Sequence, residues 1–168
     1  MKSGTVRYSE SPVWDREGDC LLLPTVADRI EESDFNDEIY EAAGETVRNS
    51  YRRDLPLRIG NVSVTGGGTL SVARIVHVPV QTAPGVPTTP ENLQVGLRSG
   101  LVTADEDGTR TILLARPIPD DQIDEFDVEG FVETLHEDLT QYPPAHFEEI
   151  ILAGQAPTWM EAVKKTFD

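Results

Sequence analysis

The chain has 168 residues, a length typical of one domain, and carries 30 acidic against 14 basic residues, for a formal net charge of −16. This charge argues against a nucleic-acid partner, because a phosphate backbone would be repelled. No apolar run approaches the roughly 18 residues of a membrane span and no basic, apolar leader opens the sequence, so we expect no membrane contact.

The cysteine and lysine contents bear on the redox compartment and the salt environment of the protein. The single cysteine, Cys20, cannot form an internal disulfide and lies in an apolar run, which predicts a small core residue and a reducing, cytoplasmic location. Of the basic residues, only Lys2, Lys164 and Lys165 are lysines. An acidic, lysine-poor surface is typical of proteins kept soluble in concentrated salt, so we consider a halophilic source, with an acidic mesophilic protein as the alternative.

Two strands and a helix are predicted in the amino-terminal third. Thr5–Tyr8 alternates in polarity, and Cys20–Leu23 is apolar at every position, which suits a buried strand of a parallel sheet that stops at Pro24. A polar loop over 27–34 follows. Apolar residues at helical spacing then predict one helix with Ser33 or Asp34 as its N-cap, and its inner face is formed by Phe35, Ile39, Ala42, Ala43, Val47 and Tyr51.

A glycine triplet, Gly66-Gly67-Gly68, lies between two further predicted strands, Asn61–Thr65 and Val72–Val78. Glycine-rich loops can cradle phosphate, but here no Lys-Ser or Lys-Thr follows and no helix opens. A P-loop is therefore excluded, and a connection between neighbouring strands is favoured. His77, in the second strand, has no cysteine or acid at catalytic spacing, so we interpret it as a strand histidine whose hydrogen bonds are satisfied.

The carboxyl-terminal half continues the alternation of helices and strands. A surface connection is predicted over Gln81–Pro90, with Thr89 as the N-cap of a helix that begins at Pro90 and ends near Gly108. The remaining predicted elements are a strand at 111–115, a polar loop at 116–125, a helix at 128–139, a strand at 147–153 and a closing helix that begins with a capping box at Thr158.

This alternation predicts a single domain over residues 1–168 of the α/β class. The expected architecture is a three-layer α/β/α sandwich with a mixed, mostly parallel central sheet. The loops at 27–34 and 116–125 each follow a predicted strand, so we expect them at the same edge of the sheet. Open α/β sheets usually bind their ligands at that edge.

Two segments resemble the macro domain family, whose members bind ADP-ribose. Asp19–Val26 and the helix that ends in Ala42-Ala43-Gly44 are similar to a strand of the type D-A-I-V-N-A-A-N and a helix ending in A-A-G. The second segment is similar to G-x-A-x-x-T-x-G-x-x-L followed by V-I-H. Its matching residues are Gly60, Val62, Thr65, Gly67, Leu70 and His77. The resemblance implies a macro-type fold with an ADP-ribose site between two loops.

The resemblance also shows where this sequence departs from the family. Val26 stands where an asparagine holds the distal ribose, and 31–34 stands where a glycine run approaches the phosphates. Residues 118–123 replace a loop of the type S-T-G-x-Y-G without any glycine, and Pro119 cannot donate a backbone hydrogen bond. The ligand-binding positions that the resemblance implies are Thr25, Val26, Ser33, Asp34, Phe35, Pro117, Ile118, Pro119, Asp120, Asp121 and Gln122.

Charge and missing motifs together favour a macro-type protein with a degenerate ADP-ribose site, acting as a non-catalytic binding or regulatory module. Its partner would be a protein or a nucleotide-type small molecule, and the sequence suggests no catalytic residue, cofactor or metal-ligand set. A crevice that binds a cation, or an anion bridged by Mg²⁺, is one alternative, and a hydrolase of ADP-ribose derivatives is another. The carboxylates that would repel a diphosphate are Glu31, Glu32, Asp34, Asp120, Asp121, Asp124 and Glu125.

Overall fold

The computed structural model describes residues 5–9, 18–27, 37–81, 89–115, 127–141, 143–153 and 157–167. No helix within these ranges is long and apolar enough to cross a bilayer. The elements are β1 (Thr5–Ser9), β2 (Gly18–Val26), α1 (Asp37–Ala43), α2 (Glu45–Asp54), β3 (Ser63–Gly66), β4 (Val72–Gln81), α3 (Pro90–Glu106), β5 (Thr111–Leu114), α4 (Val128–Gln141), β6 (Glu149–Ala153) and α5 (Pro157–Phe167).

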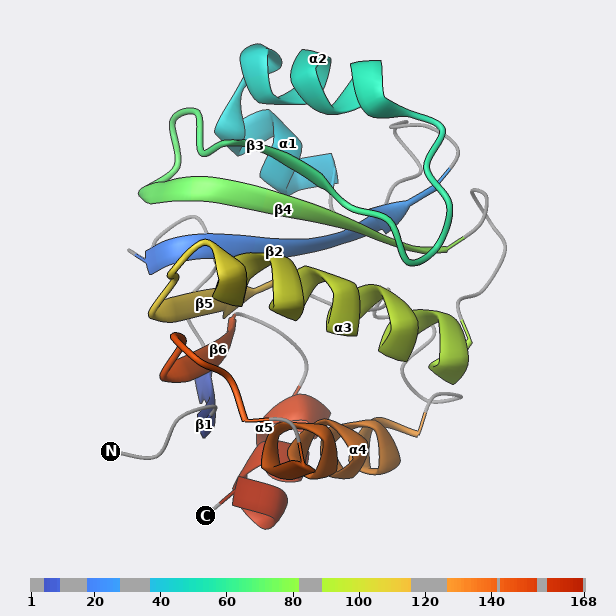
Figure 1. The fold of residues 1–168 in the computed structure, drawn as a ribbon, viewed down its shortest axis with the longest axis vertical. Coiled ribbons are helices and arrows are strands. Elements are labelled where there is room, and N and C mark those ends of the chain that lie inside the picture. Colours follow the sequence, from blue (N-terminus) through green and yellow to red (C-terminus); the bar gives the residue numbers. More distant parts are fainter. Residues whose placement is uncertain are drawn as a thin grey trace.

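The strands form one mixed sheet in the order β1-β6-β5-β2-β4-β3 (Figure 1). Four of its neighbouring pairs are parallel, and β3 alone runs antiparallel to its neighbour β4. The long strand β2 is central, because it pairs with β4 on one side and with β5 on the other. The predicted mixed, mostly parallel sheet is therefore confirmed.

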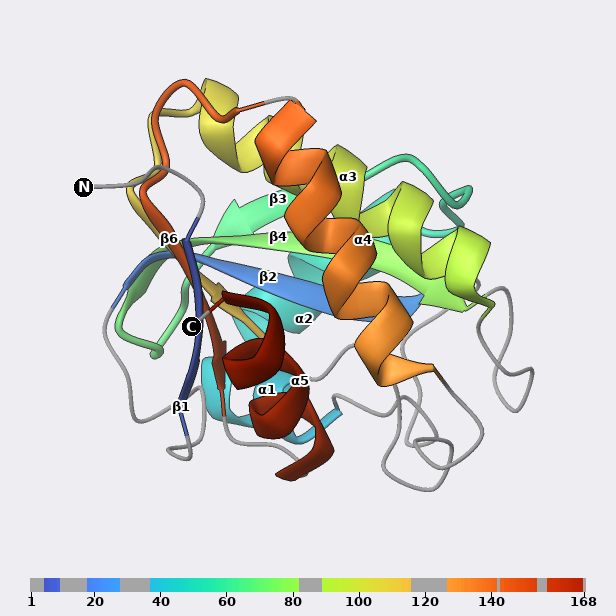
Figure 2. The ribbon, with the colours of Figure 1, turned by 90° about the horizontal axis from the view of Figure 1, so that it is seen from below.

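Helices cover both faces of this sheet, as Figures 1 and 2 show from two directions. In β2, alternate side chains enter opposite cores, because successive residues of a strand point to opposite faces. Cys20 and Leu22 pack in the core that holds the inner faces of α3, α4 and α5. Leu21 and Leu23 pack in the core that holds α1 and α2. The predicted three-layer sandwich is confirmed.

The strand β2 continues past Pro24, where the sequence predicted its end. The carbonyl of Leu22 accepts a hydrogen bond from Ala115 N at 3.0 Å, on the β5 side of the strand. Pro24 lies two residues further along on the same side, beyond the last residue of β5, Leu114. Its missing N–H therefore costs no bond to β5, and β2 extends to Val26 along β4.

The single helix predicted up to Tyr51 is in fact two helices, α1 and α2, separated by Gly44. Gly44 has φ 106°, a conformation that residues with a side chain rarely adopt, and it is the N-cap of α2. Helical spacing continues through the break, because Ile39 in α1 and Val47 and Tyr51 in α2 all reach the same core. The helical periodicity therefore predicted the buried face correctly, but it did not predict the break between α1 and α2 at Gly44.

Three other predicted boundaries can be compared with the structure. Thr89 caps α3 as predicted, since its side chain accepts a hydrogen bond from Asn92 N at 3.1 Å. Gln81 was assigned to the surface connection but is the buried last residue of β4. Thr158 lies inside α5, which begins at Pro157, so the predicted capping box is wrong.

The glycine triplet connects β3 to β4, as the sequence predicted. Gly66 ends β3, and the turn closes through a hydrogen bond from Leu70 N to Gly67 O at 3.0 Å. Gly68 has φ 60°, and the next residue, Thr69, donates its N–H to the carbonyl of Ala43 at 3.0 Å. The turn is therefore bound to the carboxyl end of α1, and a role in holding phosphate is not needed to explain its glycines.

At the edge of the sheet where β5 and β6 begin, Asp105 joins α3 to the segment before β6. Its carboxylate accepts hydrogen bonds from the backbone N–H groups of Ala145, His146 and Phe147 at 2.9, 2.7 and 3.0 Å. Burial alone would raise the pKa of Asp105, but these N–H groups outweigh it and hold the pKa below its ordinary value. The residue therefore acts as a charged cap for an irregular segment.

We expect the substitution Asp105→Ala to lower the free energy of unfolding by about 2 kcal/mol, because three backbone N–H groups lose a charged acceptor. Urea denaturation at pH 7 would measure the loss. The matched control is Glu106→Ala on the same turn, which is exposed and should change stability by less than about 0.5 kcal/mol. The Asp105 contribution should be intact above about pH 4 and should disappear as the pH falls further. Equal losses in the two variants would contradict the capping role.

Candidate functional site

The candidate site lies at the edge of the sheet where the parallel strands end. The neighbouring strands β2 and β5 end at Val26 and Leu114. In the sequence, the predicted loops at 27–34 and 116–125 begin within two residues of these ends. A hydrogen bond from Ala115 N to Leu22 O at 3.0 Å joins the two strands where β5 ends. The strands that precede the two predicted loops are thus neighbours that end at one edge, while residues 28–34 and 116–125 of the loops lie outside the described residues.

The backbone at the end of β2 is held by three hydrogen bonds. A shift in strand register occurs between Thr25 and Val26, after which Ala27 N donates to the carbonyl of Gln81 at 2.8 Å. The carbonyl of Ala27 accepts from Leu57 N at 2.9 Å. The hydroxyl of Tyr51 donates to the carbonyl of Val26 at 3.3 Å. This end of the strand is therefore a fixed platform, and the side chains of Thr25 and Val26 are fully buried in it.

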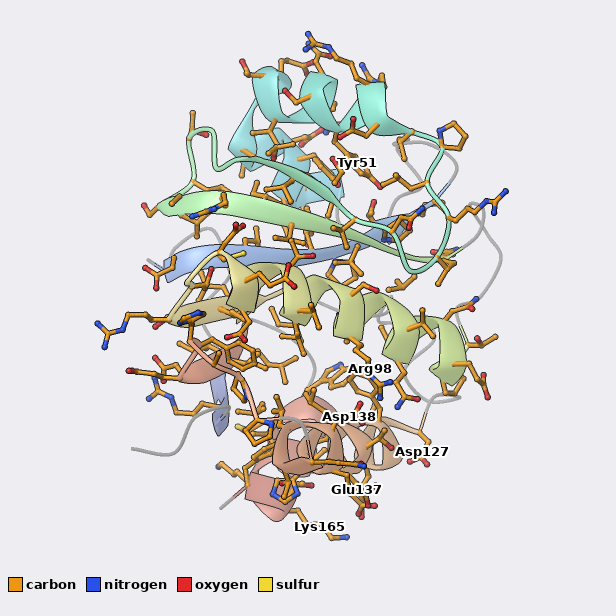
Figure 3. The ribbon with its side chains drawn as sticks, in the orientation of Figure 1. Tyr51, Arg98, Asp127, Glu137, Asp138 and Lys165 are labelled. Atoms are coloured by element: carbon orange, nitrogen blue, oxygen red, sulfur yellow. The ribbon has the colours of Figure 1, made fainter. Side chains whose placement is uncertain are left out.

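A stack of three aromatic rings lies in the same core. The ring of His77 is 4.4 Å from the ring of Tyr51 and 5.5 Å from that of Tyr40, measured between centroids, and all three rings are nearly parallel. All three side chains are fully buried. Figure 3 labels Tyr51, which reaches from α2 toward the sheet. The stack joins α1 and α2 to β4 beneath the platform.

Hydrogen bonds determine the protonation state of His77. Thr65 Oγ1 donates to the carbonyl of Gly66 at 3.0 Å, so it can only accept from His77 Nε2, which lies 2.9 Å away. Tyr40 then donates its hydroxyl proton to Nδ1 at 2.7 Å. Burial lowers the pKa of His77 to about 3. The imidazole is a neutral structural group, which confirms the interpretation made from the sequence.

Cys20 is a core residue, as the sequence predicted. Its side chain is 1% exposed and belongs to the core beneath α3 and α4. Burial raises the pKa of its thiol to about 12, even though Arg74 acts in the opposite direction. A protonated, enclosed thiol is a poor nucleophile, which agrees with a structural role for Cys20.

Of the predicted ligand-binding positions, Thr25 and Val26 lie at the end of β2, in the platform. Within the described ranges, no group of three or more His, Cys, Asp or Glu side chains is arranged to hold a metal ion. The other predicted positions, Ser33, Asp34, Phe35, Pro117, Ile118, Pro119, Asp120, Asp121 and Gln122, lie outside the described residues.

Sequence reasoning missed two contributors to the platform. Tyr51 was identified only as a buried helix residue, and the bond from its hydroxyl to β2 has no sequence signal. Gln81 was assigned to a loop, although the apolar run before it, Val78-Pro79-Val80, could have extended the predicted strand by three residues. Both residues act on the backbone around Val26, which is the position where the family's asparagine was expected.

Family comparison identifies the chain. The model of the macro domain matches residues 29–116, just over half of the sequence. The protein belongs to the macro domain family. The match includes α1, α2, β3, β4, α3 and β5, the elements that surround the platform.

Individual relatives of this macro domain are distant. An uncharacterised protein of Aquifex aeolicus is 22% identical over 127 residues, which cover 76% of each chain. The crystal structure of a Trypanosoma brucei macrodomain has a TM-score of 0.73 at 17% identity, and a structure of that macrodomain with ADP-ribose has a TM-score of 0.71. The match to the first covers 96% of this chain and 66% of the trypanosomal one, so this chain spans about two thirds of its length.

A further solved structure extends the comparison. The macro domain of ganglioside induced differentiation associated protein 2 has a TM-score of 0.75 at 14% identity, over 96% of this chain and 82% of that one. At these identities the structural likeness establishes the fold, and the chemistry of the site has to be argued from this chain's own residues.

Proposed function

We propose that this macro domain is a non-catalytic binding or regulatory module whose ADP-ribose site is degenerate. The observation that carries the proposal is the chemistry at position 26. The side chain there is a fully buried valine with no hydrogen-bonding group, and its backbone carbonyl already accepts the hydroxyl of Tyr51. A ribose placed beside this residue would therefore not find the side-chain amide of the family's asparagine.

The composition of the two loops supports the same proposal. The first loop has Glu31, Glu32 and Asp34 where the family has a glycine run. The second carries Asp120 and Asp121 and contains no glycine. Carboxylates in place of backbone N–H donors would repel a diphosphate, and each close like-charge contact costs on the order of 1 kcal/mol or more.

The alternative function is binding or hydrolysis of ADP-ribose or a related nucleotide metabolite. Family membership favours it, and the related Trypanosoma brucei macrodomain has been crystallised with ADP-ribose. A variant of this alternative has Mg²⁺ between the acidic loops and the diphosphate, since hard cations prefer carboxylate oxygens. Both versions of the alternative require the loops to hold the diphosphate, either with hydrogen-bond donors or through a bound metal ion. A degenerate site would lack both.

Calorimetric titration of ADP-ribose into the purified protein separates the proposals. We expect no binding tighter than about 1 mM, in low or high potassium chloride and with or without Mg²⁺. The Trypanosoma brucei macrodomain is the positive control in each buffer. Micromolar binding without Mg²⁺ would refute the degenerate site, and micromolar binding only with Mg²⁺ would establish the metal-bridged variant. Release of ADP-ribose from a modified peptide would refute the non-catalytic role.

Urea denaturation at increasing potassium chloride concentration tests the halophilic hypothesis. The loops and the rest of the sequence contribute a net charge of −16, and its self-repulsion weakens as salt screens it. A halophilic protein should gain stability continuously up to molar potassium chloride. A midpoint of urea denaturation that stops rising at a few tenths molar would indicate an ordinary acidic protein.

A further inference from the structure

A groove with a volume of about 470 Å³ lies between α3 and α4. Figures 1 and 2 both show these helices as neighbours on one side of the sheet. Among the described residues, neither Thr25 nor Val26 lines the groove, so it is distinct from the candidate site at the end of β2. Its apolar lining is formed by Leu97, Leu101, Phe131, Leu135, Leu139 and Phe147.

The groove follows both helices lengthwise. On α3, lining residues recur every three or four positions from Gln94 to Glu106, and on α4 they do so from Phe131 to Leu139. At 1.5 Å per residue, the α3 stripe is about 18 Å long, which corresponds to about three turns of a helix. A groove of this length between two helices suits a third helix that lays its apolar side chains into it.

The apolar surface extends from the groove onto the outside of α3. Among the described residues, the large hydrophobic side chains that are exposed are Val64, Val95 and Val102, and the last two belong to α3. Val102 lines the groove and is 51% exposed. A helix seated in the groove would cover Val102 and would remove apolar surface from water, which favours binding.

The charge around the groove selects the partner. Three acidic side chains, Asp105, Glu106 and Asp138, line the groove, whereas Arg98 is the only lysine or arginine among its described lining residues. Arg98 is already paired with Asp138 at 2.9 Å, and Figure 3 shows the two side chains pointing toward each other across the groove. Asp105 and Glu106 lie at one end of the lining without a basic neighbour in it. The rim is therefore complementary to a positively charged partner.

We infer that the groove between α3 and α4 is a docking site for a basic amphipathic helix of a partner protein. Leucine-type side chains of that helix fill the groove over Leu101 and Leu135, and its lysines or arginines face Asp105 and Glu106 at the end of the lining. The same negative charge repels nucleic acid and anionic lipid headgroups. This docking function is independent of the ligand proposed at the sheet edge, and it gives a module without catalysis a means to bind a protein.

The test uses an 18-residue synthetic peptide with leucines along one helical face and lysines elsewhere. A scrambled peptide of the same composition has the same charge without the apolar face. We expect the amphipathic peptide to bind at least tenfold more tightly in calorimetry, and to shift backbone amide NMR signals of α3 and α4. Val102→Gln should weaken binding about fivefold, because it removes exposed apolar contact without adding charge.

Val64→Gln is the matched control, since Val64 is 44% exposed and lies on β3 on another part of the molecule. It should leave the affinity unchanged. Equal binding of both peptides, amide shifts away from α3 and α4, or the same loss in both valine variants would overturn the inference. A dimer that Val102→Gln abolishes would also overturn it, because a second copy of the chain would then occupy the groove. The ADP-ribose titration has no bearing on these outcomes.

Discussion

Replacing Gly67 with alanine is expected to lower the free energy of unfolding by about 3 kcal/mol. A Cβ at this position would lie 2.0 Å from the carbonyl oxygen of Val72 and 3.0 Å from its carbonyl carbon. Backbone atoms cannot move aside as a flexible side chain can, so the turn from β3 to β4 would have to open. The hydrogen bond from Leu70 N to Gly67 O would be strained with it.

The neighbouring glycine provides the control. A Cβ at Gly66 meets no atom within 4 Å, so Gly66→Ala should change stability by less than about 1 kcal/mol. Both variants change one residue of the same triplet and add the same methyl group. Urea denaturation followed by circular dichroism compares them directly. Similar midpoints for the two variants would mean that the β3–β4 turn relaxes easily, contrary to its close contact with Val72.

The second large effect is a loss of stability below pH 6.5 caused by His77. In the folded protein its pKa is about 3, and in the unfolded chain it is near the ordinary value of 6.5. Between these values the unfolded chain binds a proton that the folded protein does not, so a fall in pH favours unfolding. The contribution is about 1.4 kcal/mol per pH unit, up to about 5 kcal/mol across the whole window.

The variant His77→Gln isolates this effect, because glutamine offers similar hydrogen-bonding groups to Tyr40 and Thr65 but does not titrate. It should be less stable than the wild type at pH 7, since the ring stack is lost. From pH 6 to pH 4, however, its free energy of unfolding should fall less steeply than that of the wild type, by the contribution of one proton. The carboxylates titrate in both proteins and cancel in the comparison. Parallel pH curves would contradict a neutral, buried His77.

The fold was largely predictable because its core strands have strong patterns. Cys20–Leu23 is uniformly apolar, as is typical of a strand covered on both faces. Thr89 before Pro90 predicts a helix start, because the threonine side chain caps the first turn and proline suits the first helical position. Local patterns failed where long-range pairing decided the outcome. Pro24 continues in a strand because β5 ends beside it, and nothing in the sequence near Pro24 indicates where β5 ends.

The candidate site was less predictable than the fold. The end of β2 could be located because a ligand edge follows from the order of strands, and Thr25 and Val26 lie there. The bond from Tyr51 to Val26 joins residues 25 positions apart, and the one from Tyr40 to His77 joins residues 37 positions apart. Helical spacing predicts that both tyrosines are buried, but it carries no information on which hydroxyl meets which acceptor.

The pairing of β1 with β6 has a consequence for synthesis of the chain. Thr5 lies opposite Glu149 in the register of the two strands, so the earliest of the described strands to be synthesised pairs with the latest. At translation rates of 5–20 residues per second, roughly 7 to 30 seconds separate the two. By the end of that interval the strands β2, β4 and β5 have been made, and their edge at β5 is still open. The chain therefore depends on late closure of the sheet, when β6 enters between β5 and the waiting amino-terminal strand.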